Sequence, residues 1–170
     1  MTDSAVRAAT RADAAEMVRL GEFMYVTVGM TVSPSWQISA IAQLEHRLDG
    51  GDLHGFVVDA GDRQLAACGV LNVTRQLPLP REHSGMRGHV QWVATDPAHQ
   101  RQGHARAVMK EVMRVARELE LENVTLLSSP MARGMYERLG FVCVPDVTYP
   151  PKTRGVPMQW RATSLGQGAS

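Results

Sequence analysis

The sequence predicts a mixed α/β protein built around one central sheet. Residues 55–59 and 65–72 are adjacent apolar segments separated by a Gly- and Asp-containing turn, which is the pattern of a hairpin. Residues 124–127 form a short continuous apolar run, typical of a strand buried on both faces. Between residues 105 and 119, apolar residues recur at helical spacing. A hairpin-rich first half and a strand–helix–strand second half favour a mixed α+β or α/β sheet.

The first third of the chain is expected to contain one strand and two helices. A short strand spans 6–9, and a helix follows over about 12–21, with Thr10 as its cap and Asp13 near its positive end. A second helix begins after Ser35 and is ended by the Asp- and Gly-rich residues 49–52. Its inner face is expected to consist of Ile38, Ile41, Ala42, Leu44 and Leu48.

The remaining segments complete the order β-α-α-β-β-β-α-β-α-β-β. After the hairpin come a strand at 90–95, the long helix to about 120 and the strand at 124–127. A short helix over 131–139 is ended by Gly140, a C-cap glycine. Strands at 141–144 and 158–160 follow, separated by a long loop. We expect one domain over residues 1–163 and a flexible tail over 164–170.

Composition narrows the class of protein. The chain of 170 residues is 44% hydrophobic and 21% charged, as expected for a soluble globular domain. No apolar run is long enough for a membrane span and no signal core is present, so a cytoplasmic location is expected. A net charge of +1 argues against a nucleic-acid-coating protein. Cys68 and Cys143 lie in strand-like runs and are interpreted as apolar residues, and no Cys/His cluster has metal-ligand spacing.

The most informative segment joins the strand at 90–95 to the long helix. Its loop, QRQGHA at 100–105, places Gly103 just before the helix begins. The first backbone N–H groups of a helix are unpaired and lie at its positive end, so they suit an anion. Gly103 allows close approach of a ligand, and Arg101 adds charge. The segment therefore predicts a site for a polyphosphate.

Gln100, Gly103 and Ala105 resemble the Q/R-x-x-G-x-G/A signature of the GCN5-related N-acetyltransferase (GNAT) family. The resemblance implies the GNAT fold over about residues 4–162, with about seven strands and four helices. It also implies that the strands ending at Thr95 and Ser128 splay apart, and that the loop holds the pyrophosphate of acetyl-CoA. Arg114 and Arg117 are interpreted as a solvated helix face. The cofactor-binding residues implied here are Gln100, Arg101, Gln102, Gly103, His104, Ala105 and Arg106.

The segment MYERLGF at 135–141 resembles a second family motif, which closes over coenzyme A. The resemblance implies that Tyr136 faces the thioester sulfur and, as general acid, gives a proton to the departing thiolate. Taken alone, Tyr136 is also consistent with a half-buried structural tyrosine. Ala132 matches a small residue of the family pattern, and Ser129 stands where the family usually has Asn, with a shorter reach.

Acyl transfer also needs an oxyanion donor and a neutral amine. In the family, a β-bulge before the phosphate loop supplies a backbone N–H, which falls here at Val93. Alternation along a strand places residues 89, 91, 93 and 95 on one face, so Thr95 joins Val93 there. His89 stands at the position where some members of the family carry a Glu, and a neutral histidine there could accept the proton of the amine. The alternative is that His89 is a surface histidine without a catalytic role. An amine that arrives neutral needs no base, and the weaker candidates are Glu22, Tyr25, His83 and Asp146.

The acceptor amine is left open among a small molecule, a peptide or protein N-terminus, and a toxic amine. A homodimer is left open too. Rival functions are transfer from another acyl-CoA, a coenzyme A sensor without catalysis, and a nucleotide-binding protein, which the absence of G-x-x-x-x-G-K-[ST] and G-x-G-x-x-G disfavours. In the family, the acceptor is held by the first two helices and the loop before the last strand, which carry Phe23, Met24, Tyr25, Met30, Trp36, Asp146, Tyr149 and Arg154.

Overall fold

In the part of the chain that the structure describes, seven strands form one mixed sheet in the order β1-β2-β3-β4-β5-β7-β6. The computed structural model describes residues 5–78, 80, 84–144 and 155–162. Strands β4 and β5 run parallel, and the other neighbouring strands are antiparallel. The expected tail at 164–170 and most of the loop before the last strand lie outside the described residues. The strands are β1 (Val6–Ala8), β2 (Leu53–Gly61), β3 (Gln64–Arg75), β4 (Met86–Thr95), β5 (Asn123–Ser128), β6 (Val142–Cys143) and β7 (Val156–Arg161).

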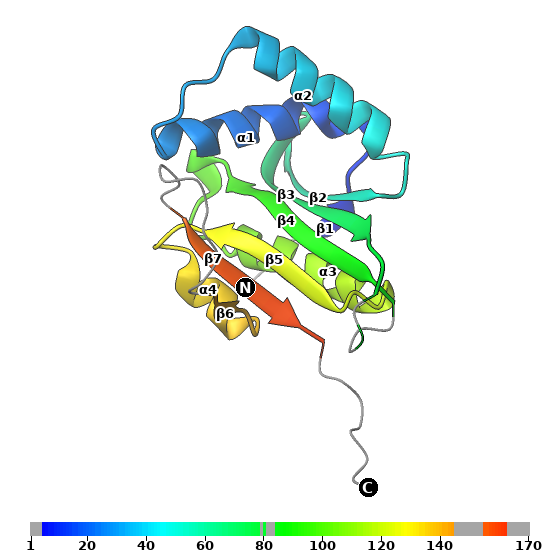
Figure 1. Ribbon diagram of the computed structural model, residues 1–170. Coiled ribbons are helices and arrows are strands. Elements are labelled where there is room, and N and C mark those ends of the chain that lie inside the picture. The colour runs from blue at the N-terminus through cyan, green and yellow to red at the C-terminus, as the bar shows by residue number, and fades with distance from the viewer. Residues whose placement is uncertain (1–4, 79, 81–83, 145–154, 163–170) are drawn as a thin grey trace, which may run out of the picture.

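Helices cover both faces of the sheet (Figure 1). Among the described residues, two helices lie on one face and two on the other, and the total of four agrees with the expected number of helices. Among the described residues, no helix combines the length and apolar character needed to cross a bilayer. The helices are α1 (Ala14–Thr27), which follows a 3-10 turn at Arg11–Asp13, α2 (Pro34–Arg47), α3 (His104–Glu118) and α4 (Arg133–Arg138).

The sheet separates two hydrophobic clusters. Successive residues of β2 alternate between them: Phe56 and Val58 belong to the cluster under α3 and α4, and Val57 belongs to the cluster under α1 and α2. This is the period of two that a strand covered on both faces requires. Cys68 is fully buried in the second cluster, as its apolar surroundings in the sequence predicted, and both cysteines are free thiols.

The two N-terminal helices differ in detail from the expectation. Helix α1 runs to Thr27, well past the predicted end at residue 21. The predicted inner face of α2 is wrong at Ile38, which is 71% exposed, and at Ala42, which is also exposed. Helix α2 packs against α1 through a narrower stripe of its surface, containing Trp36, Ala40, Ile41, Leu44 and Leu48.

A β-bulge interrupts the pairing of β4 with β3. Cys68 pairs with Ala94 and Val70 with Gln91, so Gly69 alone lies opposite both Trp92 and Val93. Trp92 adopts a φ of +53°, which is uncommon for a residue other than glycine. The expectation that residues 89, 91, 93 and 95 share one face is therefore wrong. The extra residue resets the alternation, so that Trp92 and Ala94 lie with the α1–α2 cluster and Val93 packs with the α3 cluster.

Strands β4 and β5 part before they end. Their pairing runs from Arg87 with Asn123 to Val90 with Leu126. Beyond that point β4 continues to Thr95 and β5 to Ser128 without further mutual pairs, and Figure 1 shows their ends apart. The expected splay is confirmed. In sheets with helices on both faces, a parting of this kind at the carboxyl ends of parallel strands is where ligands bind.

Candidate active site

The loop after β4 is fixed to helix α1 at its start. The Asp96 carboxylate accepts a hydrogen bond from the Ala98 amide at 2.9 Å and one from Arg19 Nη1 at 2.7 Å. Arg19 also pairs with Glu16 on its own helix. The Ala98 amide, with Arg19 beside it, holds the pKa of Asp96 below its ordinary value. Asp96 therefore stays ionised and holds the loop in place at neutral pH.

The loop ends in a set of unused backbone donors. Gly103 is the N-cap of α3 with a φ of +88°, and a Cβ built on it would meet no atom within 4 Å. Within the described part of the chain, the amides of residues 102–106 donate no hydrogen bond. Arg101, at a φ of +64°, and Arg106 are exposed beside them. Open amides at the positive end of a 15-residue helix form an anion-binding cradle.

His104, the first residue of α3, carries two further unpartnered polar atoms. Both of its ring nitrogens are buried, and neither has a hydrogen-bond partner among the described residues. The ring packs edge-on against His99, with 6.1 Å between centroids. Burial, and then the neighbouring His99, lower the pKa of His104. Buried polar atoms of folded proteins nearly always have partners, so these nitrogens suit a polar ligand. His99 was not identified from the sequence, because nothing in the loop pattern marks it as a neighbour of His104.

The basic residues farther along α3 are not part of the cradle. Arg114 is exposed and pairs with Glu111 and Glu118 on the same helix. Arg117 lies over the ring of Trp160, at 5.6 Å from its centroid. Both side chains are exposed, in agreement with their interpretation as a solvated helix face.

Helix α4 follows β5 at the other side of the parting strands and carries Tyr136. The Ala132 amide, at the N-cap, donates to the carbonyl oxygen of Ser129 at 3.1 Å and to its hydroxyl at 3.3 Å. Tyr136 is 5% exposed and packs edge-on against Phe141, with 5.9 Å between centroids. Burial raises the pKa of Tyr136 to about 12, so its phenol keeps its proton across the physiological range. Gly140, at a φ of +90°, ends the helix region as predicted.

His89 lies on β4 beside β5, just before the strands part. Its Nδ1 is 2.8 Å from the hydroxyl of Thr125, and that hydroxyl is 3.4 Å from the Gly88 carbonyl. If the Thr125 hydroxyl donates its hydrogen bond to the Gly88 carbonyl, the Thr125 oxygen accepts a hydrogen bond from His89 Nδ1–H. The lone pair of the neutral His89 ring is then on Nε2. Burial lowers the pKa of His89, which keeps the ring neutral near pH 7. A neutral ring whose Nε2 has no hydrogen-bond partner among the described residues can accept a proton.

On the α1–α2 face, three aromatic side chains meet. Tyr25 from α1, Trp36 from α2 and Trp92 from the β4 bulge are in mutual contact. The sequence suggested Tyr25 and Trp36 as acceptor-site candidates, but Trp92 was treated only as a strand residue, because the effect of the bulge on its orientation has no local signal. Met24 packs against the core cluster on this face, and Met30 is 57% exposed. The other candidates His83, Asp146, Tyr149 and Arg154 lie outside the described residues.

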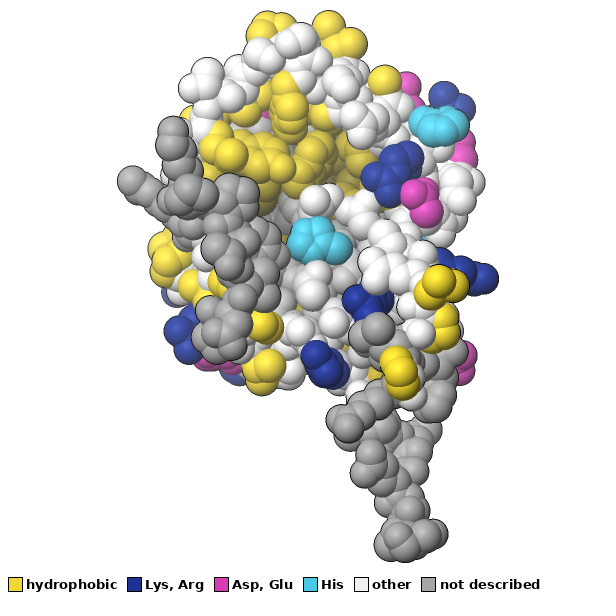
Figure 2. All heavy atoms as spheres, viewed as in Figure 1, with side chains coloured by type: hydrophobic (Ala, Val, Ile, Leu, Met, Phe, Trp, Pro, Cys, Tyr) yellow, Lys and Arg dark blue, Asp and Glu magenta, His cyan; other side chains and the backbone are white. Residues whose placement is uncertain are grey.

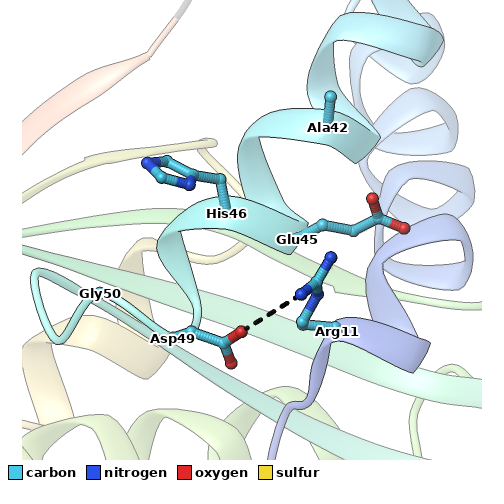
Figure 3. A pocket seen from close by; sticks show the side chains of 6 residues that line it. All are labelled: Arg11, Ala42, Glu45, His46, Asp49 and Gly50. Carbon is cyan, nitrogen blue, oxygen red and sulfur yellow. Dashed lines mark ion pairs between the residues drawn. The ribbon is translucent and has the colours of Figure 1, made fainter.

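A separate pocket lies at the C-terminal end of α2, and Figure 3 shows its lining. Arg11 lies between Glu45 and Asp49 there, and its guanidinium is 3.7 Å from the Asp49 carboxylate. None of the site residues predicted from the sequence lines this pocket. It is therefore not the cradle. Among the described residues, no cluster of three or more His, Cys, Asp or Glu side chains suits a metal ion.

Comparisons with known proteins agree with this geometry. A family model described as an acetyltransferase (GNAT) domain matches residues 25–162. A predicted acetyltransferase with acetyl-CoA from Clostridium acetobutylicum is similar in structure, with a TM-score of 0.76 at 16% identity over 86% of this chain and 94% of that one. A GCN5-related N-acetyltransferase from Ralstonia eutropha JMP134 gives 0.75 at 23% identity over 86% and 97%. An acetyltransferase of the GNAT family from Staphylococcus aureus MU50 gives 0.68 at 11% over 92% and 98%. No curated protein matches the sequence.

Proposed function

The chain belongs to the GNAT acetyltransferase family, and we propose that it transfers the acetyl group of acetyl-CoA to a primary amine by direct attack. The observation that carries this proposal is the cradle at the start of α3. Its amides at residues 102–106 have no protein partner in the described part of the chain and lie beside Arg101 and Arg106. A diphosphate supplies the acceptor oxygens and the negative charge that these groups lack.

In this proposal, coenzyme A is bound by residues at the carboxyl ends of β4 and β5, where the two strands part, and in the segments that follow them. Gln100 to Arg106 surround the diphosphate, with His104 offering its unpartnered ring nitrogens. Val93 and Thr95 border the acyl and pantetheine portion along β4. Ser129 and Ala132 border it on the α4 side, where the exposed Ser129 presents a hydroxyl in place of the family's Asn amide. The Clostridium structure is similar in fold and contains acetyl-CoA, which supports this choice of donor.

The transfer forms a carbon–nitrogen bond and breaks the carbon–sulfur bond of the thioester. The β4 bulge leaves Val93 without a partner in the register with β3, and its N–H is the proposed donor to the oxyanion. Tyr136 holds a proton to give to the departing thiolate. His89 Nε2, directly or through water, takes the proton that the amine loses. The proposed roles of Tyr136 and His89 fit the protonation states that burial favours in their side chains.

Replacing Gly103 with Asp tests the cradle. The carboxylate would enter the space that the diphosphate needs and would add like charge, so we expect coenzyme A affinity to fall at least about 100-fold, or about 3 kcal/mol. Isothermal titration with coenzyme A measures the loss. Gly51→Asp is the matched control, because Gly51 also has a positive φ of +77° and open space around its Cβ. Both variants carry similar backbone strain, and only Gly103→Asp should lose the ligand.

Thiol release from acetyl-CoA with a panel of amines tests the transfer itself. Tight binding of coenzyme A without turnover on any amine would support a sensor instead. Faster turnover with propionyl- or butyryl-CoA than with acetyl-CoA would assign a different acyl donor. Normal affinity in Gly103→Asp would show that the diphosphate is bound elsewhere.

A further inference from the structure

We propose that the acceptor is a primary amine joined by a short chain to an aromatic or similarly flat apolar group, which is bound by the rings of Tyr25, Trp36 and Trp92. The proposal rests on the proposed acetyl transfer and specifies its second substrate. We call these three residues the aromatic cluster. Its position, its packing and its polar atoms each support this choice.

The aromatic cluster is built from three elements that are distant in the sequence. The ring centroids are 5.6 Å apart for Tyr25 and Trp36, 6.3 Å for Tyr25 and Trp92, and 5.7 Å for Trp36 and Trp92. All three side chains are only partly buried, so ring surface is left for another molecule. Figure 2 shows hydrophobic side chains gathered in a recess between the α1–α2 pair and the sheet. A flat apolar group in edge or offset contact with these rings is the favourable occupant.

The bulge places the aromatic cluster next to the reacting carbonyl. Val93 supplies the proposed oxyanion donor, and Trp92 is the residue before it. The φ of +53° at Trp92 puts its indole on the α1–α2 face while Val93 packs toward α3. When a substrate amine approaches the carbonyl from the α1–α2 face, the part of the substrate a few atoms away from the amine nitrogen therefore contacts the Trp92 indole. This proximity favours a short spacer between the amine and the flat group.

The helix α1 backbone holds the indole in place. A Cβ on Gly21 would lie 3.1 Å from the Trp92 ring, so the glycine lets the helix pack directly on it. Trp92 Nε1–H donates to the Tyr25 hydroxyl at 3.0 Å. The hydroxyl proton of Tyr25 then remains available for an acceptor atom of the substrate. Glu22 on α1 accepts a hydrogen bond from Gln37 Nε2 on α2 at 2.5 Å, which links the two helices that carry Tyr25 and Trp36.

The test compares amines and their acetylated products. Purified protein with acetyl-CoA is supplied with 2-phenylethylamine, n-butylamine or spermidine, and kcat/KM is measured for each. Binding of N-acetyl-2-phenylethylamine and N-acetylbutylamine to the coenzyme A complex is measured by titration. We expect 2-phenylethylamine and its product to be preferred at least about tenfold. Trp36→Ala should remove most of that preference and leave coenzyme A affinity unchanged, whereas Ile38→Ala, on the exposed side of the same helix, should leave the preference intact.

Equal use of the three amines, or equal affinity for the two products, would overturn the aromatic acceptor. So would a Trp36→Ala variant that keeps the full preference while folding normally. If Trp36→Ala does not fold, Trp36→Leu replaces it as the test, because leucine keeps an apolar side chain but removes the aromatic ring, and it should likewise reduce the preference for 2-phenylethylamine. Failure of the proposed function has a different signature: coenzyme A binding is then absent, or the thioester is not consumed with any amine while the product titrations still rank the ligands.

Discussion

At the scale of single residues, burial shifts the pKa values of the two proposed proton-transfer groups in opposite directions. Desolvation disfavours the charged form, so it raises the pKa of the acid Tyr136 and lowers that of the base His89. At neutral pH the phenol therefore holds a proton to give, and the imidazole has an open lone pair. Sequence reasoning named both residues from motif positions. It had no information on their protonation, because that depends on Phe141, Thr125 and the surrounding core.

Tyr136→Phe should separate binding from chemistry. Phenylalanine keeps the ring that packs against Phe141, so the fold and coenzyme A affinity should be retained. Without the phenolic proton, kcat should fall about 100-fold, the lower end of the usual contribution of a positioned acid. Steady-state kinetics and titration with coenzyme A measure the two quantities. An unchanged kcat would remove the acid role.

His89→Gln should change the pH dependence of the reaction. Protonated His89 cannot accept a proton, so kcat/KM of the wild type should decline as the pH falls. The apparent pKa of this decline should be below about 6.5, because burial lowers the pKa of this histidine from its ordinary value. Gln can still bond to Thr125 but does not titrate. The ratio of wild-type to variant kcat/KM, measured with the same amine so that its own ionisation cancels, should therefore fall toward low pH. A ratio that is constant with pH would exclude His89 as the base.

At the scale of elements, prediction succeeded where the signal is local. Helix α3 and strand β5 have strong patterns of burial along their own sequence, and their predicted bounds lie within two residues of those observed. The packed face of α2 depends on partners. The β4 bulge was implied by the family resemblance and is present, but its effect on the strand faces was not foreseen: one extra residue opposite Gly69 exchanges the faces of all residues that follow it.

Gly21→Ala tests the contact between α1 and the bulge. The new methyl group would lie 3.1 Å from the Trp92 ring, so either the helix or the indole must move. We expect a loss of about 1 to 3 kcal/mol in the free energy of unfolding despite the better helix propensity of alanine. The kcat/KM for the amine should fall while coenzyme A affinity stays unchanged. Gly134→Ala is the control for stability, because the nearest atom to its Cβ is at 3.6 Å and it should be neutral or stabilising. An equal, small effect of both variants would show that Trp92 adapts freely.

At the scale of the whole molecule, the sequence predicted the order of elements, the cradle and two residues of the aromatic cluster, Tyr25 and Trp36, but not that Trp92 joins them. The cradle is a local segment of one strand end, one loop and one helix start. The aromatic cluster joins residues 25, 36 and 92, and its assembly depends on the packing of two helices across the sheet. Long-range ion pairs also escape prediction. Arg7 on β1 donates to Asp13 before α1 and to Asp59 on β2, and Arg19 on α1 reaches Asp96 after β4.

These ion pairs make the stability of the fold sensitive to acid. Hydrogen bonding to Arg7 lowers the pKa of Asp13 from 3.8 to about 2, against the opposing effect of burial. Because the pKa is lower in the folded state, the stabilisation is complete above pH 3.8 and is lost as the pH falls toward 2.

Asp13→Asn should therefore cost about 1 to 2 kcal/mol in the free energy of unfolding at pH 7, a figure reduced for the partial exposure of Arg7. The cost should shrink between pH 4 and pH 2, where the wild type loses the same interaction. Urea unfolding at pH 7, 4 and 2.5 measures it, and Asp62→Asn, on an exposed turn without an ion pair in the described part of the chain, is the control. A cost that stays constant down to pH 2.5 would show that Asp13 acts through its shape and neutral hydrogen bonds, and that its charge does not hold β1 and α1 together.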